Sequence, residues 1–404
     1  MTGMPLPVAA GTVRQPMWAV RLCAALLLVR ASCDPLLEAL RDEGGGMGPG
    51  ALLNALLLLA ALRLALLRPH PLAALVLPMW APFLLAGLAS AVIAPDVAGA
   101  MRLALVQASY CAAFALPFWL IRGQADRLRW LRLLLLSSLL PACWGLAEFA
   151  LGRDAQGDGL YRLQGTFSHP NIFAFYLLLM IALSLYLLRV ASPSPATRRL
   201  MWAYLLVLLM LLLLTRTRSA WAGCLLLFVV YGLLAERRFL VYALAAPALL
   251  LLNDDVRARL ADIAAGAYDD QGQLNSYAWR VLLWRAGLRW MDGMHWLYGY
   301  GLESFRFYSP QFFPLPGQDS WDPHNVYIQL YFETGAAGLA AYGWLFLRLL
   351  PRLWRAAPSW PAAVIALAMA LAYLLTSWSD NMLYYLSFNW YFWFFIGSAA
   401  VREA

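Results

Sequence analysis

The stretches SYAWRVLLWRAGLRW at residues 276–290 and WDPHNVYIQLYFETGAAGL at residues 321–339 decide how this chain is organised. The first belongs to residues 253–325, the only long segment that is too polar for the hydrocarbon core of a membrane. The second runs from that segment into an apolar run, and the rest of the chain is one apolar run after another. We therefore predict that a membrane frame holds residues 253–325 and that this segment carries the chemistry.

The composition places the chain in a membrane. Of its 404 residues, 63% are hydrophobic and only 13% are charged, whereas a soluble domain carries roughly 25% charged residues. A large soluble core cannot explain the difference, because the surface area of a protein does not shrink fast enough with size. No cleaved signal peptide is evident at the N-terminus, so the first apolar run is expected to remain as an anchor.

About twelve apolar runs approach the roughly 20 residues that a helix needs to cross a bilayer. They are expected at residues 18–37, 51–67, 72–93, 98–121, 128–150, 171–190, 200–214, 219–234, 239–252, 326–350, 361–378 and 382–400. This pattern predicts an all-α polytopic membrane protein with one long periplasmic loop that contains short helices. In one integrated domain, residues 1–252 would hold nine spanning helices, residues 253–325 the loop, and residues 326–404 three more helices.

Arginine sets the predicted orientation, because the sequence contains no lysine and has a formal net charge of +8. The arginines gather in alternate connections, among them residues 122–132, 198–199 and 348–355, while the other short connections nearly lack them. Positively charged connections favour the cytoplasmic side of a membrane. Both termini are therefore predicted to be cytoplasmic, and the long loop is predicted to face the periplasm of a bacterial inner membrane.

Several kinds of site are not expected. No GxxxxGK[ST] loop, GxGxxG turn or HExxH helix occurs, so nothing indicates a nucleotide or a metalloprotease zinc. Five cysteines without close pairs argue against a disulfide framework. The paired aspartates are interpreted as solvated loop charges rather than metal ligands. These are Asp154 with Asp158, Asp254 with Asp255, and Asp269 with Asp270. We expect no metal, cofactor or nucleic acid.

Two arginines interrupt the apolar sequence LLLLTRTRSAWAG at residues 211–223. A charge within a spanning segment is costly, so Arg216 and Arg218 either snorkel to the interface or face a cavity or partner. Beside the hydroxyl groups of this turn, their planar guanidinium groups match the oxygens of a phosphate. We therefore expect an anion site here, at the periplasmic boundary.

The segment at residues 276–291 is predicted to be an amphipathic helix that lies on the membrane, because it is too basic to span it. Arg285 and Arg289 share one face at a spacing of four, where lipid headgroups are an alternative ligand, while Arg280 lies on another face. The following YGYGLESF predicts a tight turn at its glycines. Glu303 in this turn could orient a histidine or bind a sugar hydroxyl.

His324 is the strongest candidate for proton transfer, because histidine titrates near neutral pH. It stands in WDPHN at residues 321–325, so we expect it in the first turn of a membrane helix, whose N-terminus would keep the ring neutral. A purely structural role at the helix start is the alternative. The rival is His169 in GTFSHPNIFAF at residues 165–175, which together with Asn171 is expected to cap and pack its own helix.

Together these motifs resemble those of the O-antigen ligase superfamily, which also includes O-antigen polymerases and protein-O-oligosaccharyltransferases. The resemblance runs from about residue 161 to residue 338 and rests on the order of GTFSHPNIFA, LLTRTRSAWAG, RVLLW, GYGLESF and DPHNVYIQLYFETGAAGL. It implies a bacterial inner-membrane glycosyltransferase with a C-type glycosyltransferase-like architecture. It also implies a glycan donor linked to undecaprenyl diphosphate, used on the periplasmic face without metal, nucleotide or other cofactor.

The resemblance also implies roles for single residues. Arg218 and Arg280 would hold the donor's diphosphate, and His324 would be the base that takes a proton from the acceptor hydroxyl. Thr217 stands where the family often has serine, and it keeps the hydroxyl group. The other residues expected to bind substrate are Arg216, Arg289, Glu303, Asn325 and His169.

The chain length and the single large loop favour the ligase branch, which joins O-antigen to lipid A–core. An O-antigen polymerase or a protein-O-oligosaccharyltransferase is the alternative within the superfamily. From a different class, a transporter of lipid-linked sugar would use the arginines only to bind the headgroup. The inverted repeats typical of many transporters are not evident in the sequence.

Overall fold

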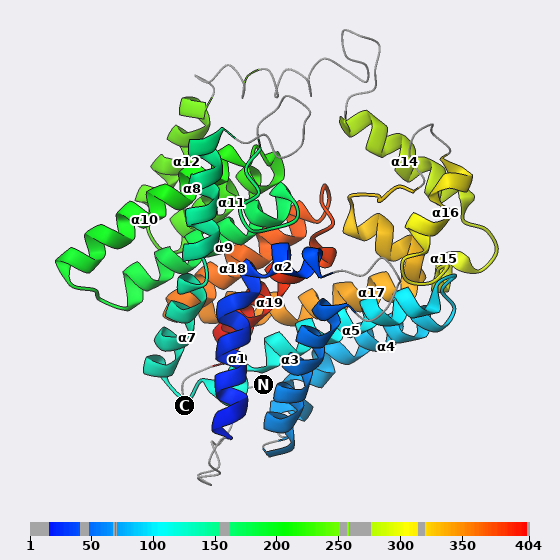
Figure 1. The fold of residues 1–404 in the computed structure, drawn as a ribbon, viewed down its shortest axis with the longest axis horizontal. Coiled ribbons are helices and arrows are strands. Elements are labelled where there is room, and N and C mark those ends of the chain that lie inside the picture. The colour runs from blue at the N-terminus through cyan, green and yellow to red at the C-terminus, as the bar shows by residue number, and fades with distance from the viewer. Residues whose placement is uncertain are drawn as a thin grey trace.

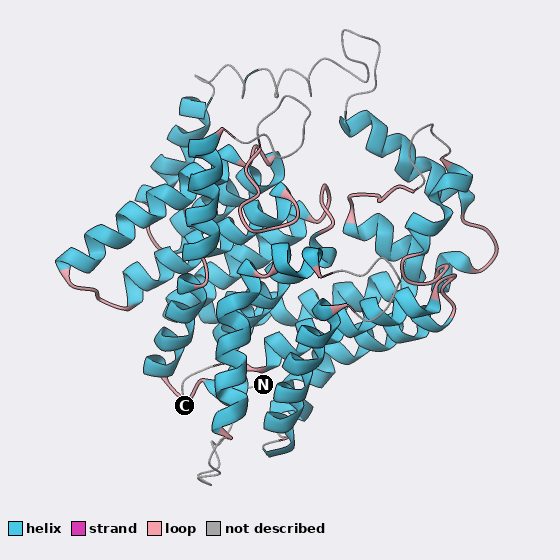
Figure 2. Cartoon of the chain, in the orientation of Figure 1, coloured by secondary structure: helices cyan, strands magenta, loops and turns pink. Residues whose placement is uncertain are grey.

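The computed structural model describes residues 16–40, 48–67, 69, 71–152, 162–250, 257, 276–313 and 320–401 (Figure 1). Within these ranges every regular element is a helix (Figure 2), which agrees with the predicted all-α class. Parts of the predicted loop lie outside the described residues, namely residues 253–256, 258–275 and 314–319. The aspartates at positions 154, 158, 254, 255, 269 and 270 lie outside them as well.

The helices follow one another as labelled in Figure 1. The first part of the chain forms α1 (Met17–Val29), η1 (Arg30–Ser32), α2 (Asp34–Ala39), α3 (Pro49–Leu67), η2 (Leu72–Val76), α4 (Leu77–Val92), α5 (Val97–Ala115), α6 (Pro117–Leu120), α7 (Gln124–Leu136), α8 (Leu139–Leu151) and α9 (Pro170–Val190). The second part forms α10 (Pro195–Leu214), α11 (Arg218–Leu234), α12 (Arg238–Leu250), α14 (Ser276–Trp290), α15 (His295–Tyr298), α16 (Ser304–Phe312), α17 (Val326–Ala356), η3 (Ala357–Ser359), α18 (Pro361–Thr376), η4 (Met382–Tyr384) and α19 (Leu386–Ala400).

Six helical segments of the described chain are long and apolar enough to cross a membrane. They are Pro49–Leu67, Ala74–Val92, Val97–Leu120, Gln124–Leu151, Pro170–Val190 and Pro195–Leu214. Two shorter apolar helices, α11 and α18, accompany them. The first predicted run, residues 18–37, is broken at η1, and α19 begins four residues later than the last predicted run. A total of twelve spanning helices stays a prediction.

Helix α9 is the centre of the bundle. It is apolar on all sides, a pattern typical of a helix that neighbours surround completely, and every residue from 173 to 187 is buried. Helices α7, α10, α11, α18 and α19 pack around it. Aromatic rings fill the space between α18 and α19, where the ring centroids of Tyr373 and Phe392 are 4.4 Å apart. This packing fixes where the ends of α9 and α18 lie.

Helices α14, α15 and α16, which we call the α14–α16 unit, lie together on the right of Figure 1 against the first half of α17. The buried side chains of Leu283, Phe305 and Phe332 form the apolar contact between them. Because this contact is small and aromatic, the unit resembles a layer placed on the bundle rather than a continuation of its core.

The predicted glycine turn attaches this unit to α17 through the main chain. The N–H of Gly301 donates to the carbonyl of Glu333 at 2.9 Å. Helix α17 kinks at Gly335, where φ is 64°, and a Cβ there would lie 2.2 Å from the main chain of α15. The turn was predicted but the kink was not. Only glycine allows the two backbones to come this close.

Candidate functional site

His324 lies in the connection that leads into α17, not in the helix itself. Its φ of 48° is in the left-handed region, which few side chains adopt. Helix α17 begins at Val326, because the Asn325 side chain accepts hydrogen bonds from the N–H groups of Tyr327 and Ile328 at 2.9 and 3.1 Å. The predicted position in the first helical turn was therefore wrong, because Asn325, the residue after His324, caps the start of the helix.

The surroundings of His324 keep its ring neutral. Burial, and to a smaller extent the positive charge of Arg280 and the neighbouring His169, together lower the pKa of His324 from 6.5 to about 4. The predicted neutral state agrees with this direction, although burial rather than the helix N-terminus is the main cause. Its Nδ1 is buried and meets no hydrogen-bond partner within the described ranges. A neutral imidazole of this kind can accept a proton.

Arg280 reaches the same place from α14. Its Nη1 donates to the carbonyl of Ser379 at 3.1 Å. One turn further along the helix, Nε1 of Trp284 donates to the carbonyl of Pro323 at 2.6 Å. These two bonds attach α14 both to the connection after α18 and to the connection before α17, so the charge of Arg280 lies beside His324.

Asp380 connects three of these segments, although the sequence did not single it out. Its carboxylate accepts hydrogen bonds from Nδ2 of Asn171 at 2.6 Å, from the hydroxyl of Tyr385 at 2.9 Å and from the hydroxyl of Ser219. The residue is only 2% exposed, and burial raises the pKa of Asp380 while its donors and the charge of Arg280 oppose the increase. The carboxylate thus holds the starts of α9 and α11 beside the connection that binds Arg280.

The predicted arginine-rich turn lies between α10 and α11. Arg216 has a left-handed φ of 52°, and Arg218 is the first residue of α11. The hydroxyl of Thr217, a buried residue, donates to Oδ1 of Asn171 at 3.3 Å. The turn therefore combines two guanidinium groups with hydroxyl groups, as expected, and it is joined to the start of α9.

A third arginine, which precedes α9 in the sequence, contacts this turn. Arg162 donates through Nη2 to Oδ1 of Asn171 at 2.7 Å and through Nε to the carbonyl of Thr215 at 3.1 Å. Sequence reasoning missed it, because Thr215 is 53 residues away along the chain. Its place three residues before the motif GTFSHPNIFA was the one signal that pointed to it.

His169 caps α9, as predicted. Its Nδ1 accepts a hydrogen bond from the N–H of Asn171 at 3.0 Å. Burial lowers the pKa of His169 to about 4, and the charge of Arg162 acts in the same direction. Since Nδ1 is an acceptor in this neutral ring, Nε2 carries the proton. His169 is therefore suited to donate a hydrogen bond, whereas His324 is suited to take a proton.

The hydrogen bonds described above join the segments that carry these residues, which we together call the histidine–arginine cluster. It consists of Arg162, His169, Arg216, Arg218, Arg280, His324 and Asp380. Asp380 joins the starts of α9 and α11 through Asn171 and Ser219, and the N–H of Val326 at the start of α17 donates to the carbonyl of Ser377 at 2.9 Å. Helix N-termini and guanidinium groups both attract anions. The arrangement can bind a multiply charged anion and accept a proton beside it.

Two predicted substrate-binding residues lie apart from this cluster. Arg289 is exposed in the last turn of α14, nine residues and so about 13 Å along the helix axis from Arg280. Glu303 reaches the surface beside the α4–α5 connection, where desolvation and then the carboxylate of Asp96 raise the pKa of Glu303. Either residue would contact only a ligand that extends beyond the cluster.

Asn325 has a structural task that the sequence did not predict. Its side-chain oxygen caps α17, while its Nδ2 is buried and no hydrogen-bond acceptor for it lies in the described part of the chain. Its predicted role in binding substrate stays a prediction. Over the residues that the structure describes, no group of three or more histidine, cysteine, aspartate or glutamate side chains is placed to hold a metal ion.

Comparison with known proteins agrees with the motifs. Residues 202–343 match a family model described as O-antigen ligase. The matched segment contains the arginine-rich turn, Arg280 and His324, while His169 and Asp380 lie outside it. No curated protein matches the chain. With its long apolar helices and this match over 142 of its 404 residues, the chain is similar to the membrane proteins of the O-antigen ligase superfamily.

Proposed function

We propose that this protein is an O-antigen ligase that transfers O-antigen polysaccharide from undecaprenyl diphosphate to lipid A–core. The reaction would take place on the periplasmic face of the bacterial inner membrane, invert the anomeric carbon and need neither metal nor nucleotide. The observation that supports this most is a neutral, buried His324 beside Arg280, joined through Asp380 to the turn that carries Arg218. This combination provides both the proton acceptor and the anion site that the transfer requires.

The proposed reaction is a single displacement. The acceptor's hydroxyl oxygen attacks the anomeric carbon, and its proton passes to the neutral ring of His324. The bond from that carbon to the diphosphate breaks, and its electron pair leaves with undecaprenyl diphosphate. Because one bond forms on the face opposite the one that breaks, the configuration at the carbon inverts.

The arginines would bind the leaving group. Guanidinium groups bind two phosphate oxygens at once, and Arg218 and Arg280 would stabilise the negative charge that grows on the diphosphate. Preorganised donors of this kind contribute about 3–4 kcal/mol each to the stability of a transition state. Arg216 and the Nε2–H of His169 would supply further donors. A bound diphosphate would also offset the effect of Arg280 on His324 and raise the pKa of the base.

The distribution of arginines supports the proposed side of the membrane. Helix α9 carries His169 before its first residue and Arg189 in its last turn, and Arg198 and Arg199 follow in the next helix. Positively charged connections favour the cytoplasm. The start of α9, and with it the histidine–arginine cluster, would therefore face the periplasm.

A reconstituted reaction tests the proposal. The purified protein in lipid nanodiscs, given lipid-linked donor and lipid A–core but neither nucleotide nor ion gradient, is expected to form the joined product. The same yield is expected after addition of a metal chelator, and a loss of product with chelator would contradict metal independence. In liposomes, movement of the donor across the bilayer without any transfer would favour the transporter alternative.

A second experiment separates the ligase from its relatives. Lipopolysaccharide from cells that lack this protein is expected to run on a gel as core without any ladder. A core that carries one repeat would indicate a polymerase instead. An unchanged ladder with loss of glycan from a protein would indicate an oligosaccharyltransferase.

A further inference from the structure

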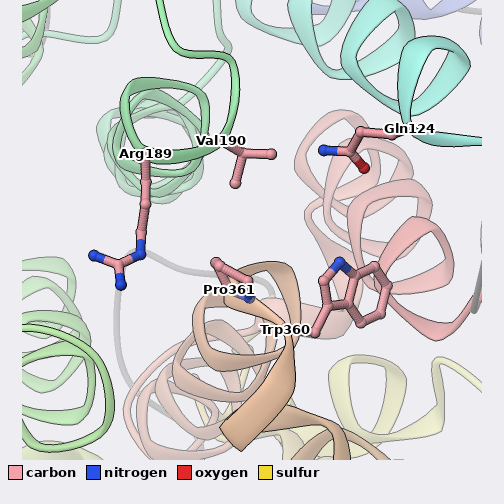
Figure 3. A pocket seen from close by; sticks show the side chains of 5 residues that line it. All are labelled: Gln124, Arg189, Val190, Trp360 and Pro361. Atoms are coloured by element: carbon pink, nitrogen blue, oxygen red, sulfur yellow. The ribbon is translucent and has the colours of Figure 1, made fainter.

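A cavity of about 570 Å³ lies at the opposite end of α9 and α18 from the histidine–arginine cluster. Gln124 of α7, Arg189 and Val190 of α9, and Trp360 and Pro361 beside α18 line it (Figure 3). Helix α9 has 21 residues and is therefore about 31 Å long, close to the thickness of a bilayer's hydrocarbon core. The cavity and the cluster thus lie near opposite surfaces of the membrane.

Arg189 gives the cavity a positive side. Its guanidinium lies 3.9 Å from the carboxylate of Glu236, and 40% of its side chain is exposed. Glu236 also pairs with Arg238. Since two guanidinium groups share one carboxylate, this edge has one positive charge in excess. A further anion can therefore bind at Arg189 without displacing a tight ion pair.

Two helix starts and a buried arginine add to this potential. Gln124 is the first residue of α7 and Pro361 the first residue of α18, and neither helix has a side-chain cap on its first N–H groups. The buried Arg127 contacts two residues that line the cavity. Its guanidinium lies 4.6 Å from the ring centre of Trp360 and donates to Oε1 of Gln124 at 2.9 Å. Positive charge in such a poorly hydrated place acts over a longer distance than it does in water.

The other walls are apolar. Val190, Pro361 and Trp360 line the cavity together with Arg189, whose guanidinium lies on the other side of Pro361 from the Trp360 ring (Figure 3). A free phosphate would need only the donors, whereas an amphiphile uses donors and apolar walls together. Tryptophan is common at membrane interfaces, and basic pockets between membrane helices bind acidic lipid headgroups. The volume lies in the range of roughly 300–1,000 Å³ that small-molecule sites occupy.

We propose that this cavity binds the phosphate-containing headgroup of an anionic phospholipid, with Arg189 as the main contact for its charge. Trp360 and Pro361 would lie against the glycerol and the first part of the acyl chains. The phosphate would lie near the start of α18. This site is separate from the glycan-transfer reaction proposed above, and neither proposal depends on the other.

Lipid binding by the intact purified protein tests the proposal. Native mass spectrometry would follow titration with phosphatidylglycerol or with phosphatidylcholine, for the wild type and for Arg189→Gln. A matched control is Arg198→Gln, because Arg198 is exposed in the first turns of α10 at the same membrane surface. We expect Arg189→Gln to weaken binding of phosphatidylglycerol about tenfold, the loss typical of one charged hydrogen bond. Arg198→Gln should bind it like the wild type.

Four results would overturn the proposal. Equal losses in both variants would show only a diffuse effect of surface charge, and equal affinity for the two lipids would exclude an anion site. Competition by glycerol phosphate at the affinity of the whole lipid would assign the site to a free phosphate. A second variant, Val190→Trp, fills the cavity without changing any charge and should also abolish binding. Unchanged binding by that variant would place the lipid elsewhere.

Discussion

The two ends of α9 both carry basic side chains, but the protein holds them in different ways. At the N-terminal end, Nη2 of Arg162 lies 2.7 Å from Oδ1 of Asn171 within a partly buried network of hydrogen bonds. At the C-terminal end, Arg189 lies 3.9 Å from its carboxylate and borders a cavity. Fixed donors suit chemistry, because they need no reorganisation during the reaction. A loosely paired cation suits a ligand that exchanges with the surrounding bilayer.

Of the changes at the N-terminal end of α9, removal of the proposed base should lower the rate of transfer most. His324→Ala is expected to lower the rate of transfer by roughly 10²- to 10⁴-fold, the usual contribution of a general base, while the arginines still bind the donor. Initial rates and donor binding of the purified variant would measure this. His295→Ala is the control, because His295 stacks on Tyr300 in the α14–α16 unit. Full transfer by His324→Ala would exclude this histidine as the base.

Loss of the planar guanidinium should have the next largest effect. Arg218→Lys and Arg280→Lys keep the charge but cannot hold two phosphate oxygens in a fixed geometry, so each is expected to lower kcat about 10²- to 10³-fold. Arg285→Lys, at an exposed position of the same helix as Arg280, should leave the rate unchanged. Full activity of both Arg218→Lys and Arg280→Lys would show that the site at the N-terminal end of α9 does not need donors held in a fixed geometry. The proposed difference between the two ends of α9 would then fail.

Asp380→Asn tests whether the buried carboxylate positions the cluster. The amide keeps the shape of the side chain but loses the charge near Arg280 and some bonds to its donors, so we expect a loss in kcat of roughly 10- to 100-fold. Asp126→Asn at the other membrane surface is the control. Thermal unfolding of both variants separates positioning from stability. A rate that falls only in proportion to the folded fraction would assign Asp380 a structural role alone.

The pH dependence should show the smallest and most specific effect. The active form of His324 is neutral, so activity is present above its pKa and is lost as the pH falls through it. Since the pKa of His324 is lowered to about 4, the acid limb of kcat/KM should lie near pH 4 rather than near 6.5. In Arg280→Gln, removal of a positive charge should move the limb of the residual activity to higher pH. An unmoved limb would contradict the proximity of the two residues.

Features that depend only on residues close together in the sequence could be predicted from local patterns. The all-helical class, the arginine-rich turn at Arg216 and Arg218, and the role of His169 at the start of α9 follow from neighbouring residues alone. The position of His324 was missed by two residues, because proline and Asn325 both favour helix starts. In the folded chain the asparagine satisfies two main-chain N–H groups, which decides the boundary.

Partners that are distant along the chain could not be predicted. Asn171 and Asp380 are 209 residues apart, and their hydrogen bond exists only because α9 and α18 pack side by side. A single aspartate in the short sequence SWSDN gives no indication of such a partner. The cavity at Arg189 was missed for the same reason, since three separate helices form its walls.

The glycine joint between the α14–α16 unit and α17 has a consequence for protein engineering. Peptide groups make this attachment, and added Cβ atoms at Gly299, Gly301 and Gly335 would lie within 2.3 Å of neighbouring main-chain atoms. Exposed side chains of α14 and α16 can therefore be varied without detaching the unit from the membrane helices. A mutant library that seeks altered glycan preference should vary those surfaces and keep the three glycines constant.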